Sequence, residues 1–175
     1  MLGGRGDAMR KQMMDEGAKT VERGGAATSD WIDLEAVAAV EISSEEQRCP
    51  IEQALGLGAE RQVSTGWRAA TTGPQTIRLR FDRPTEIRRI YLHFVEGAKE
   101  RSQEFSVHAG STEGELREVV RQQFAFSPNG ATEEVEDYRV ELKDVRVFEL
   151  RVDPDRAHDP KQSREYASLV RLKVA

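Results

Sequence analysis

The chain has 175 residues, of which 38% are hydrophobic and 33% charged, and its net charge is −5. This length suits one domain with its own core, and the mildly acidic balance argues against nucleic acid and anionic membranes as partners. Cys49 is the only cysteine, which excludes an intrachain disulfide and favours a reducing compartment. No apolar run approaches the roughly 20 residues of a membrane helix and no signal-peptide core is visible, so we expect a cytoplasmic protein.

Residues 1–29 differ in composition from the rest of the chain. Glycines are interspersed with charges of both signs, and no apolar face persists. Such a segment has too little apolar surface to form a core. We therefore expect a disordered or partly helical tail over 1–29, with 10–16 as its helical part, followed by one folded domain over 30–175.

The folded part begins with a strand and a short helix. Val40 and Ile42 predict a first strand, which ends at Ser43 and Ser44. Proline is tolerated in the first turn of a helix, so we predict a helix over 50–55 that ends at Gly56. A loop of small residues then leads to Trp67.

The rest of the chain alternates apolar and polar residues. Ile77, Leu79 and Phe81, for example, alternate with Arg78 and Arg80. Successive side chains of a strand point to opposite faces, so each run has one dry face and one charged face. The predicted strands are 75–81, 87–94, 105–107, 116–126, 138–142, 145–152 and 169–174. With the first strand this makes about eight strands at regular spacing, which predicts an all-β sandwich with one short helix.

Several short motifs follow one another in a fixed order. They are Ser43-Ser44 before the helix, Thr65-Gly66-Trp67 after the loop, Phe81-Asp82 in the hairpin 75–94, Phe105-Ser106-Val107 before Ser111 and Gly114, and Ala167-Ser168-Leu169 before the last strand. This order resembles the discoidin, or coagulation-factor type C, domains of the galactose-binding-like superfamily. The resemblance covers about 145 residues, and it rests on the ordered set because no single motif is specific.

The resemblance implies a jelly-roll sandwich that holds its ligand on loops at one end. Domains of this kind are mostly non-catalytic and bind sugars, lipid head groups or proteins, and many hold a structural calcium ion. Two departures argue against calcium here: Glu60 is the only acid in the loop 56–66, and Arg171 replaces a calcium-binding glutamate. His93, His108 and His158 show no metal-ligand spacing either, so we expect neither a metal nor another cofactor.

Candidate ligand contacts lie next to the predicted loops. Trp67 offers a stacking platform for a sugar, although a tryptophan at this point also suits packing beneath the loops. Arg68 follows it directly. Tyr166 precedes the last strand, where the edge of its ring suits contact with a sugar or a peptide.

Two polar groups that precede phenylalanines complete the candidate set. Arg101, Gln103 and Glu104 lie at a loop-to-strand junction, which is a suitable place for a binding rim. Arg121 and Gln122 fall within a strand, where satisfying buried backbone groups is the competing interpretation. Side chains of these types hydrogen-bond vicinal hydroxyls and carboxylates.

Catalytic signatures are missing from the sequence. It has no nucleophile elbow, phosphate loop or dinucleotide fingerprint, although any two of its 31 acids can meet in space as a carboxylate pair. We predict a non-enzymatic module that binds a carbohydrate-like ligand on loops at one end. The first alternative is a protein-interaction scaffold that uses sandwich edges or the tail. The others are an enzyme and a nucleic-acid binder that uses Arg78, Arg80, Arg88 and Arg89.

Overall fold

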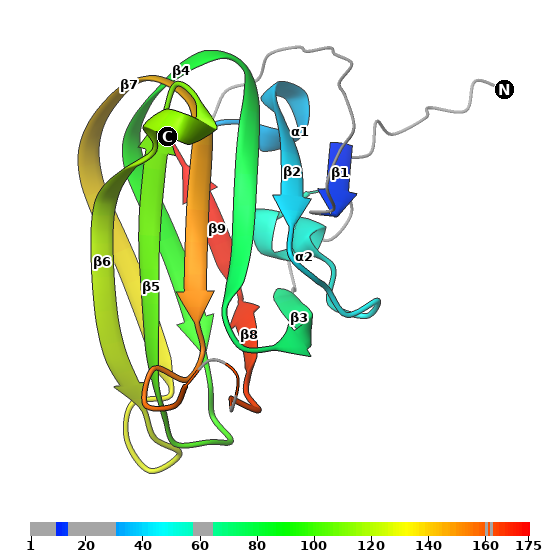
Figure 1. The fold of residues 1–175 in the computed structure, drawn as a ribbon, viewed down its shortest axis with the longest axis vertical. Helices are drawn as coiled ribbons and strands as arrows, with labels where there is room; N and C mark the ends of the chain where they lie inside the picture. The colour runs from blue at the N-terminus through cyan, green and yellow to red at the C-terminus, as the bar shows by residue number, and fades with distance from the viewer. Residues whose placement is uncertain (1–9, 14–30, 58–64, 160, 162) are drawn as a thin grey trace, which may run out of the picture.

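The computed structural model describes residues 10–13, 31–57, 65–159, 161 and 163–175. Most of these residues lie in β-strands, as Figure 1 shows. The elements are β1 (Arg10–Met13), α1 (Leu34–Val37), β2 (Ala38–Ile42), α2 (Ile51–Leu55), β3 (Trp67–Thr72), β4 (Gln75–Val95), β5 (Arg101–Gly110), the 3-10 turn η2 (Glu113–Glu115), β6 (Arg117–Phe126), β7 (Glu133–Asp153), β8 (Tyr166–Leu169) and β9 (Arg171–Val174). The prediction of an all-β sandwich with little helix is confirmed.

Two long strands organise the sandwich. β4 and β7 each have 21 residues, pair with each other along most of their length and bend together, so that each belongs to both layers (Figure 1). The first half of β4 pairs Leu79 with Phe148, whereas its second half pairs Leu92 with Glu136. The pairing changes register between Arg80 and Arg89, as is usual where a strand bends.

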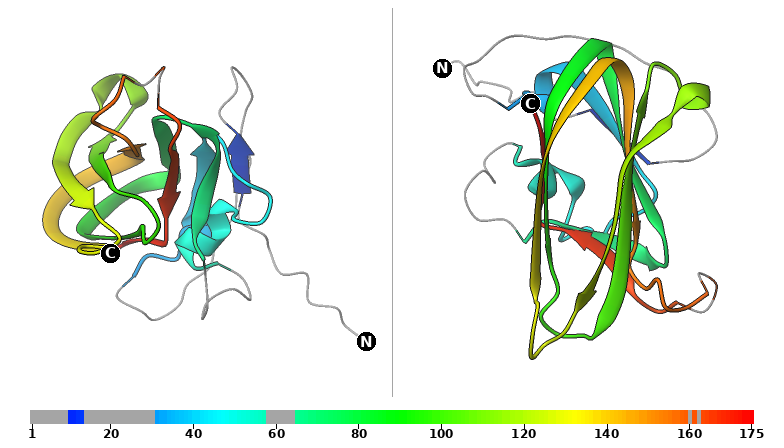
Figure 2. Two further views of the ribbon diagram at one scale, coloured as in Figure 1. Left: turned by 90° about the horizontal axis from the view of Figure 1, so that it is seen from below. Right: turned by 90° about the vertical axis from the view of Figure 1, so that its left-hand side faces the viewer.

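The strands form two facing layers. The front layer runs in the order β1-β2-β4-β7-β5-β6. The back layer has the second half of β4 between β9 and the first half of β7. A separate pair, β3 and β8, lies in the lower part of Figure 1. Figure 2 shows the two layers from two further directions.

The apolar core fills the space between the layers. Ile77, Leu79 and Phe81 are at most 4% exposed, as their alternation with arginines predicts. Phe94 and Phe105 stack on each other with ring centroids 5.4 Å apart. Burying each such side chain contributes roughly 1.5–3 kcal/mol to folding, which is why the alternation decides the layer faces.

The predicted helix forms where the sequence places it. Pro50 is the N-cap of α2, and Gly56 ends the helix in the left-handed conformation with a φ of 68°. α1 is a further single turn that the sequence analysis did not predict. No helix in the described ranges is long and apolar enough to span a membrane.

Four details differ from the predicted elements. β3 forms at Trp67–Thr72, where the sequence analysis predicted no strand. The strands predicted at 75–81 and 87–94 are one continuous strand, β4, and those at 138–142 and 145–152 are one strand, β7. The last predicted strand is interrupted at Val170, which separates β8 from β9.

The N-terminal segment differs as well. Residues 10–13, expected to be helical within a disordered tail, form β1, which pairs in parallel with β2. Arg10 makes an ion pair of 2.6 Å with Asp82 of β4. The other residues of the predicted tail lie outside the described residues.

Candidate ligand site at the lower end of the sandwich

A buried serine organises the lower end of the sandwich in Figure 1. The Ser44 hydroxyl donates to Gln75 Oε1 at 2.8 Å and accepts hydrogen bonds from the backbone amides of Ala70 and Thr71, at 3.1 and 3.2 Å. Ser44 is 5% exposed. Since buried polar groups must be hydrogen-bonded, these contacts fix the loop after β2 against β3 and the start of β4.

Trp67 is a structural residue and not a ligand platform. Its side chain is fully buried, and its indole N–H donates to the Ser44 carbonyl at 3.1 Å. A buried ring offers no face to a sugar, so the stacking role considered for Trp67 is wrong in this structure. The tryptophan instead supports the strand that carries Arg68.

Arg68 and Tyr166 meet at the surface. The Arg68 guanidinium lies 4.9 Å from the centroid of the Tyr166 ring, in a cation–π contact. The pairing of β3 with β8 brings them together. Arg68 is opposite Ser168, and Tyr166 lies two residues from Ser168 on the same face of β8. Glu46, on the loop after β2, lies 3.6 Å from the Arg68 guanidinium. An aromatic ring with a charged group over it is thus available at this end.

Arg101 lies beneath this pair and holds it in place. Its side chain is 3% exposed, and it donates to the Tyr166 carbonyl at 3.0 Å and to Gln103 Oε1 at 3.3 Å. Glu96 and Glu165 lie 3.4 and 3.8 Å away. Burial lowers the pKa of Arg101, and nearby Arg68 lowers it further, whereas the two glutamates raise it.

Two buried donor atoms in this cluster have no hydrogen-bond partner among the described residues. They are Arg101 Nε and Gln103 Nε2, and Gln103 is fully buried. Neither side chain reaches the surface, so neither forms the exposed rim that the sequence analysis expected.

The exposed rim includes residues that the sequence analysis did not select. Lys99 donates to both carboxylate oxygens of Glu165, at 3.0 and 2.9 Å, and its side chain is 53% exposed. Glu96 and Glu46, which contact Arg101 and Arg68, belong to this group as well. Their only signal in the sequence is a position in a loop next to a strand, which many unrelated residues share.

Three predicted contacts do not belong to this cluster. Glu104 and Arg121 form an ion pair on the outer face of the front layer, and Glu104 also lies 3.3 Å from Arg156. Gln122 is an exposed residue of β6 opposite Phe105. The structure therefore brings together Arg68, Arg101, Gln103 and Tyr166 from the predicted set, and leaves these three elsewhere.

Arg171, the residue that replaces a calcium-binding glutamate, makes a contact with α2. Arg171 Nη1 donates to the carbonyl of Gln53 in α2 at 3.3 Å. Within the described residues there is no group of three or more His, Cys, Asp or Glu side chains placed to hold a metal ion.

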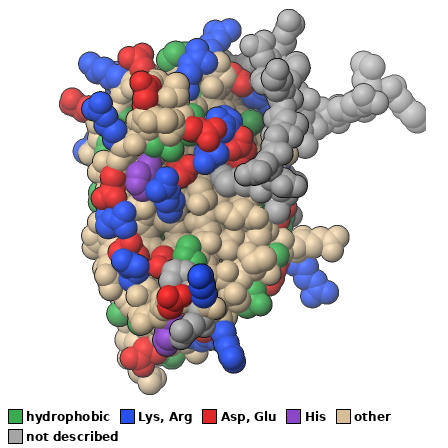
Figure 3. All heavy atoms as spheres, in the orientation of Figure 1, with side chains coloured by type: hydrophobic (Ala, Val, Ile, Leu, Met, Phe, Trp, Pro, Cys, Tyr) green, Lys and Arg blue, Asp and Glu red, His purple; other side chains and the backbone are tan. Residues whose placement is uncertain are grey.

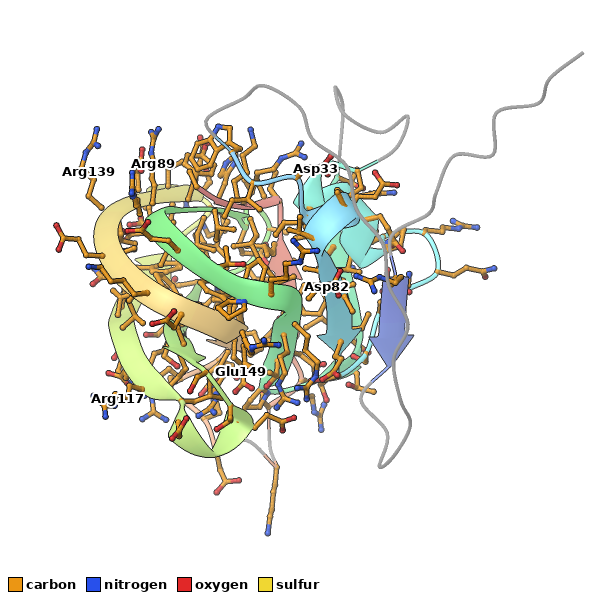
Figure 4. The ribbon with its side chains drawn as sticks, turned by 90° about the horizontal axis from the view of Figure 1, so that it is seen from above. Asp33, Asp82, Arg89, Arg117, Arg139 and Glu149 are labelled. Atoms are coloured by element: carbon orange, nitrogen blue, oxygen red, sulfur yellow. The ribbon has the colours of Figure 1, made fainter. Side chains whose placement is uncertain are left out.

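The arginines considered for nucleic-acid binding are engaged with carboxylates. Arg78 contacts Glu41 at 3.0 Å and Glu149 at 2.8 Å, and Arg80 pairs with Glu41 and Glu113. Arg88 pairs with Glu86, and Arg89 with Asp137. Figure 3 shows acidic and basic side chains intermixed over the front face, and Figure 4 shows that Arg89 and Glu149 lie on different sides of the sandwich. These arginines do not form one positive face.

Comparison with known proteins gives one family and a set of similar folds. A family model described as "Anaphase-promoting complex, subunit 10 (APC10)" matches residues 7–154. No curated protein sequence matches the chain significantly.

Among solved structures, a CBM32 domain from a family 31 glycoside hydrolase of Clostridium perfringens aligns with a TM-score of 0.57 and 15% identity over 82% of this chain and 93% of that one. The CBM32 of AlyQ in complex with 4,5-unsaturated mannuronic acid gives 0.51 and 17%, over 78% and 93%. A pectin-binding carbohydrate-binding module gives 0.53 and 12%, over 84% and 91%. At these identities the likeness shows the discoidin-like fold, as predicted.

Proposed function

This chain belongs to the anaphase-promoting complex subunit 10 (APC10) family. We propose that it is a non-catalytic binding domain, and that the lower end of the sandwich binds a carbohydrate-like ligand. Tyr166 and Arg68 would contact the ligand, with Arg101 and Gln103 as positioning residues beneath them. The observation that carries the proposal is the contact of exposed Arg68 with half-buried Tyr166 on a buried polar support. The single cysteine supports a cytoplasmic location.

The charges at this end favour a neutral, hydroxyl-bearing ligand. The basic residues are Arg68, Lys99 and Arg101, and the acidic ones in contact with them are Glu46, Glu96 and Glu165. Positive and negative groups therefore balance, so the site has no excess charge to attract an ion. Neighbouring donors and acceptors of this kind suit vicinal hydroxyls, which both donate and accept.

A protein partner is the second candidate, and family membership favours it. The family description names a subunit of a multiprotein complex. The same arginine–tyrosine pair suits a peptide, because Tyr and Arg are enriched among the residues that dominate protein interfaces.

The first test is thermal denaturation of the full chain in the presence of neutral sugars, polyols and sugar acids. A ligand at ten times its dissociation constant adds about 1.4 kcal/mol, or about 3–5 °C for a domain of this size. We expect neutral sugars to raise the melting temperature more than sugar acids do. If no compound shifts it, the carbohydrate proposal fails and the protein partner takes its place.

Variants locate the binding site. Arg68→Ala and Tyr166→Ala should each abolish most of the ligand-induced shift with little change in the melting temperature of the free protein. Arg117→Ala is the matched control, because Arg117 is exposed at the other end of the sandwich. An equal effect of all three variants would rule out the lower end as the site.

A further inference from the structure

One long side of the sandwich is bordered by two strands that lack a second neighbour within the described part of the chain. β6 is the last strand of the front layer. The first half of β7, from Glu133 to Leu142, pairs with β4 alone. The right-hand view of Figure 2 looks onto this side. Edge strands present unpaired N–H and C=O groups, which form a template for an added strand.

The first half of β7 turns carboxylates toward the interior. Glu134 is opposite Phe94 and Glu136 is opposite Leu92, and both of these partners on β4 are at most 1% exposed. Residues directly opposite each other on paired strands share one face. Both glutamates therefore point between the layers, at positions where the alternation elsewhere in the sandwich places apolar side chains.

The two inward glutamates differ from Asp137 on the outward face, which pairs with Arg89 at 2.6 Å. Glu133, also on the outward face, lies 2.7 Å from His93 Nε2. No ion pair to Glu134 or Glu136 exists among the described residues. Two like charges in a half-buried place repel each other and lose hydration.

The same surroundings favour the protonated form of Glu134. Burial raises the pKa of Glu134, and a hydrogen bond with Glu136 and the charge of Glu136 raise it further. Burial and Glu136 also raise the pKa of Tyr138, the next inward residue of β7. A cation placed beside these groups would relieve the repulsion and compensate for the lost hydration.

Aromatic side chains of β6 lie across the sandwich from the first half of β7. The ring of Phe124 lies 5.7 Å from that of Phe94 and 5.0 Å from that of Phe126. Phe124 is half-buried, and Gln122, two residues away on the same face of β6, is exposed. Both edge strands thus border one aromatic cluster, which has an amide and two carboxylates at its rim. The apolar stem of a lysine or arginine suits the rings, while its charged head suits the carboxylates.

We propose that the β6 edge takes up an extended basic segment of a partner protein as an added strand. Alternate side chains of that strand point inward, so two Lys or Arg residues spaced two apart reach Glu134 and Glu136, which have the same spacing. Backbone hydrogen bonds to β6 supply affinity, and the carboxylates select the partner. The inward acids also oppose pairing with a second copy of this chain, since inward charges protect sheet edges.

The test measures binding of short labelled peptides to the full chain by fluorescence anisotropy. The probe is a peptide in whose sequence lysine and threonine alternate. A peptide with the same composition but with its lysines in one block tests the spacing. A peptide with glutamate in place of lysine tests the charge. A peptide with N-methyl groups on alternate backbone nitrogens tests strand addition. We expect only the alternating, unmethylated lysine peptide to bind well.

Two double variants locate the contact. Glu134→Gln with Glu136→Gln removes the inward charges and should weaken binding of the alternating peptide by about tenfold or more. Glu133→Gln with Asp137→Asn removes the same charge from the outer face of the same strand and should leave the affinity unchanged. Circular dichroism of both variants confirms that each is folded.

Several results would overturn the proposal. Equal losses in the two double variants would show a general charge effect. Equal binding of the N-methylated peptide would exclude strand addition. Failure of the alternating peptide to bind would exclude the basic segment. Dimerisation of the free chain that is blocked by proline at a position in β6 would make a second copy the occupant.

Discussion

Arg101 and Gln103 are buried donors that lie beneath the contact between exposed Arg68 and half-buried Tyr166. Their residue types are those of a sugar-binding rim, yet burial gives them a positioning role: Arg101 holds the backbone of Tyr166. Trp67 is also of a residue type that suits a sugar site, but it is buried and its indole N–H donates to the Ser44 carbonyl. At the scale of single residues, exposure decides whether a group with suitable chemistry contacts a ligand.

Replacing Trp67 tests its structural role. Trp67→Phe removes the indole hydrogen bond to Ser44 and leaves a small cavity, so we expect it to lower the free energy of unfolding by about 2 kcal/mol. Urea denaturation measures this change. Arg68→Ala, on the neighbouring exposed residue, is the control and should change stability by less than about 0.5 kcal/mol. A Trp67→Phe variant as stable as the wild type would contradict the role assigned to the indole.

Neutralising Glu134 should stabilise the protein. Its pKa is raised, so the folded state is favoured while Glu134 is protonated, and this advantage is lost as the pH rises through the folded-state pKa. Glu134→Gln should therefore raise the melting temperature at pH 7 by about 1–2 °C and have less effect near pH 4. Scanning calorimetry at the two pH values measures this. Glu133→Gln, on the outward face, should bring no such gain.

At the scale of elements, one close backbone contact fixes the motif that ends in Trp67. Gly66 has a φ of 79°, and a Cβ atom there would lie 2.2 Å from the Leu169 carbonyl oxygen and 2.6 Å from Val170 Cα. Both atoms belong to the backbone of the C-terminal segment, which cannot turn aside as a side chain can. Glycine is therefore required for β3 to approach β8.

Gly66→Ala should accordingly be strongly destabilising. The positive φ and the backbone collision act together, and we expect a loss of about 3 kcal/mol in the free energy of unfolding, measured by chemical denaturation. Gly97→Ala is the matched control, because a Cβ atom there meets nothing within 4 Å. If the two variants are equally stable, the close approach of β3 and β8 is not required.

At the scale of the whole molecule, the outer face of the front layer is held by a network of ion pairs that crosses strands. Glu149 is at its centre: its side chain is 2% exposed and accepts hydrogen bonds from Arg78 and Arg151, at 2.8 and 2.6 Å. Burial opposes its ionisation, but the two arginines prevail and lower the pKa of Glu149. The network ties β4 to β7, the two strands that belong to both layers.

Acid should weaken this network. A carboxylate with a lowered pKa stabilises the fold above its unfolded-state pKa, and this contribution is lost as the pH falls through the folded-state pKa. We therefore expect the melting temperature to fall below about pH 4.5. His108, whose pKa is lowered by burial and by Arg151, adds a loss that begins near pH 6.5.

Glu149→Gln isolates the contribution of Glu149. It removes one carboxylate partner of Arg78, which keeps Glu41, and the partner of Arg151, so it should cost about 2 kcal/mol at pH 7 and make stability less dependent on pH below about 4.5. Thermal denaturation between acid and neutral pH measures both effects. Glu100→Gln, on an exposed glutamate, is the control. A variant that retains the full acid sensitivity of the wild type would show that Glu149 is not its source.

Local sequence is sufficient to predict the class of fold and the faces of the strands. Alternation such as Ile77-Arg78-Leu79-Arg80 requires one dry and one wet face wherever it occurs, because burial of each apolar side chain outweighs other local preferences. Pro50 and Gly56 likewise mark the ends of α2. The ring of proline restricts its φ angle, and glycine adopts the left-handed conformation that ends a helix.

Contacts between residues that are distant in the chain depend on how the strands pair. Arg68 and Tyr166 are far apart in the chain and touch because β3 pairs with β8, and Glu134 faces the interior because the register of β7 against β4 places it opposite Phe94. Register and bending depend on the packing of distant strands, and a shift of one residue would exchange the faces of a whole strand. Local sequence carries no such information, and for this reason the candidate site and the acidic edge became visible only in the folded molecule.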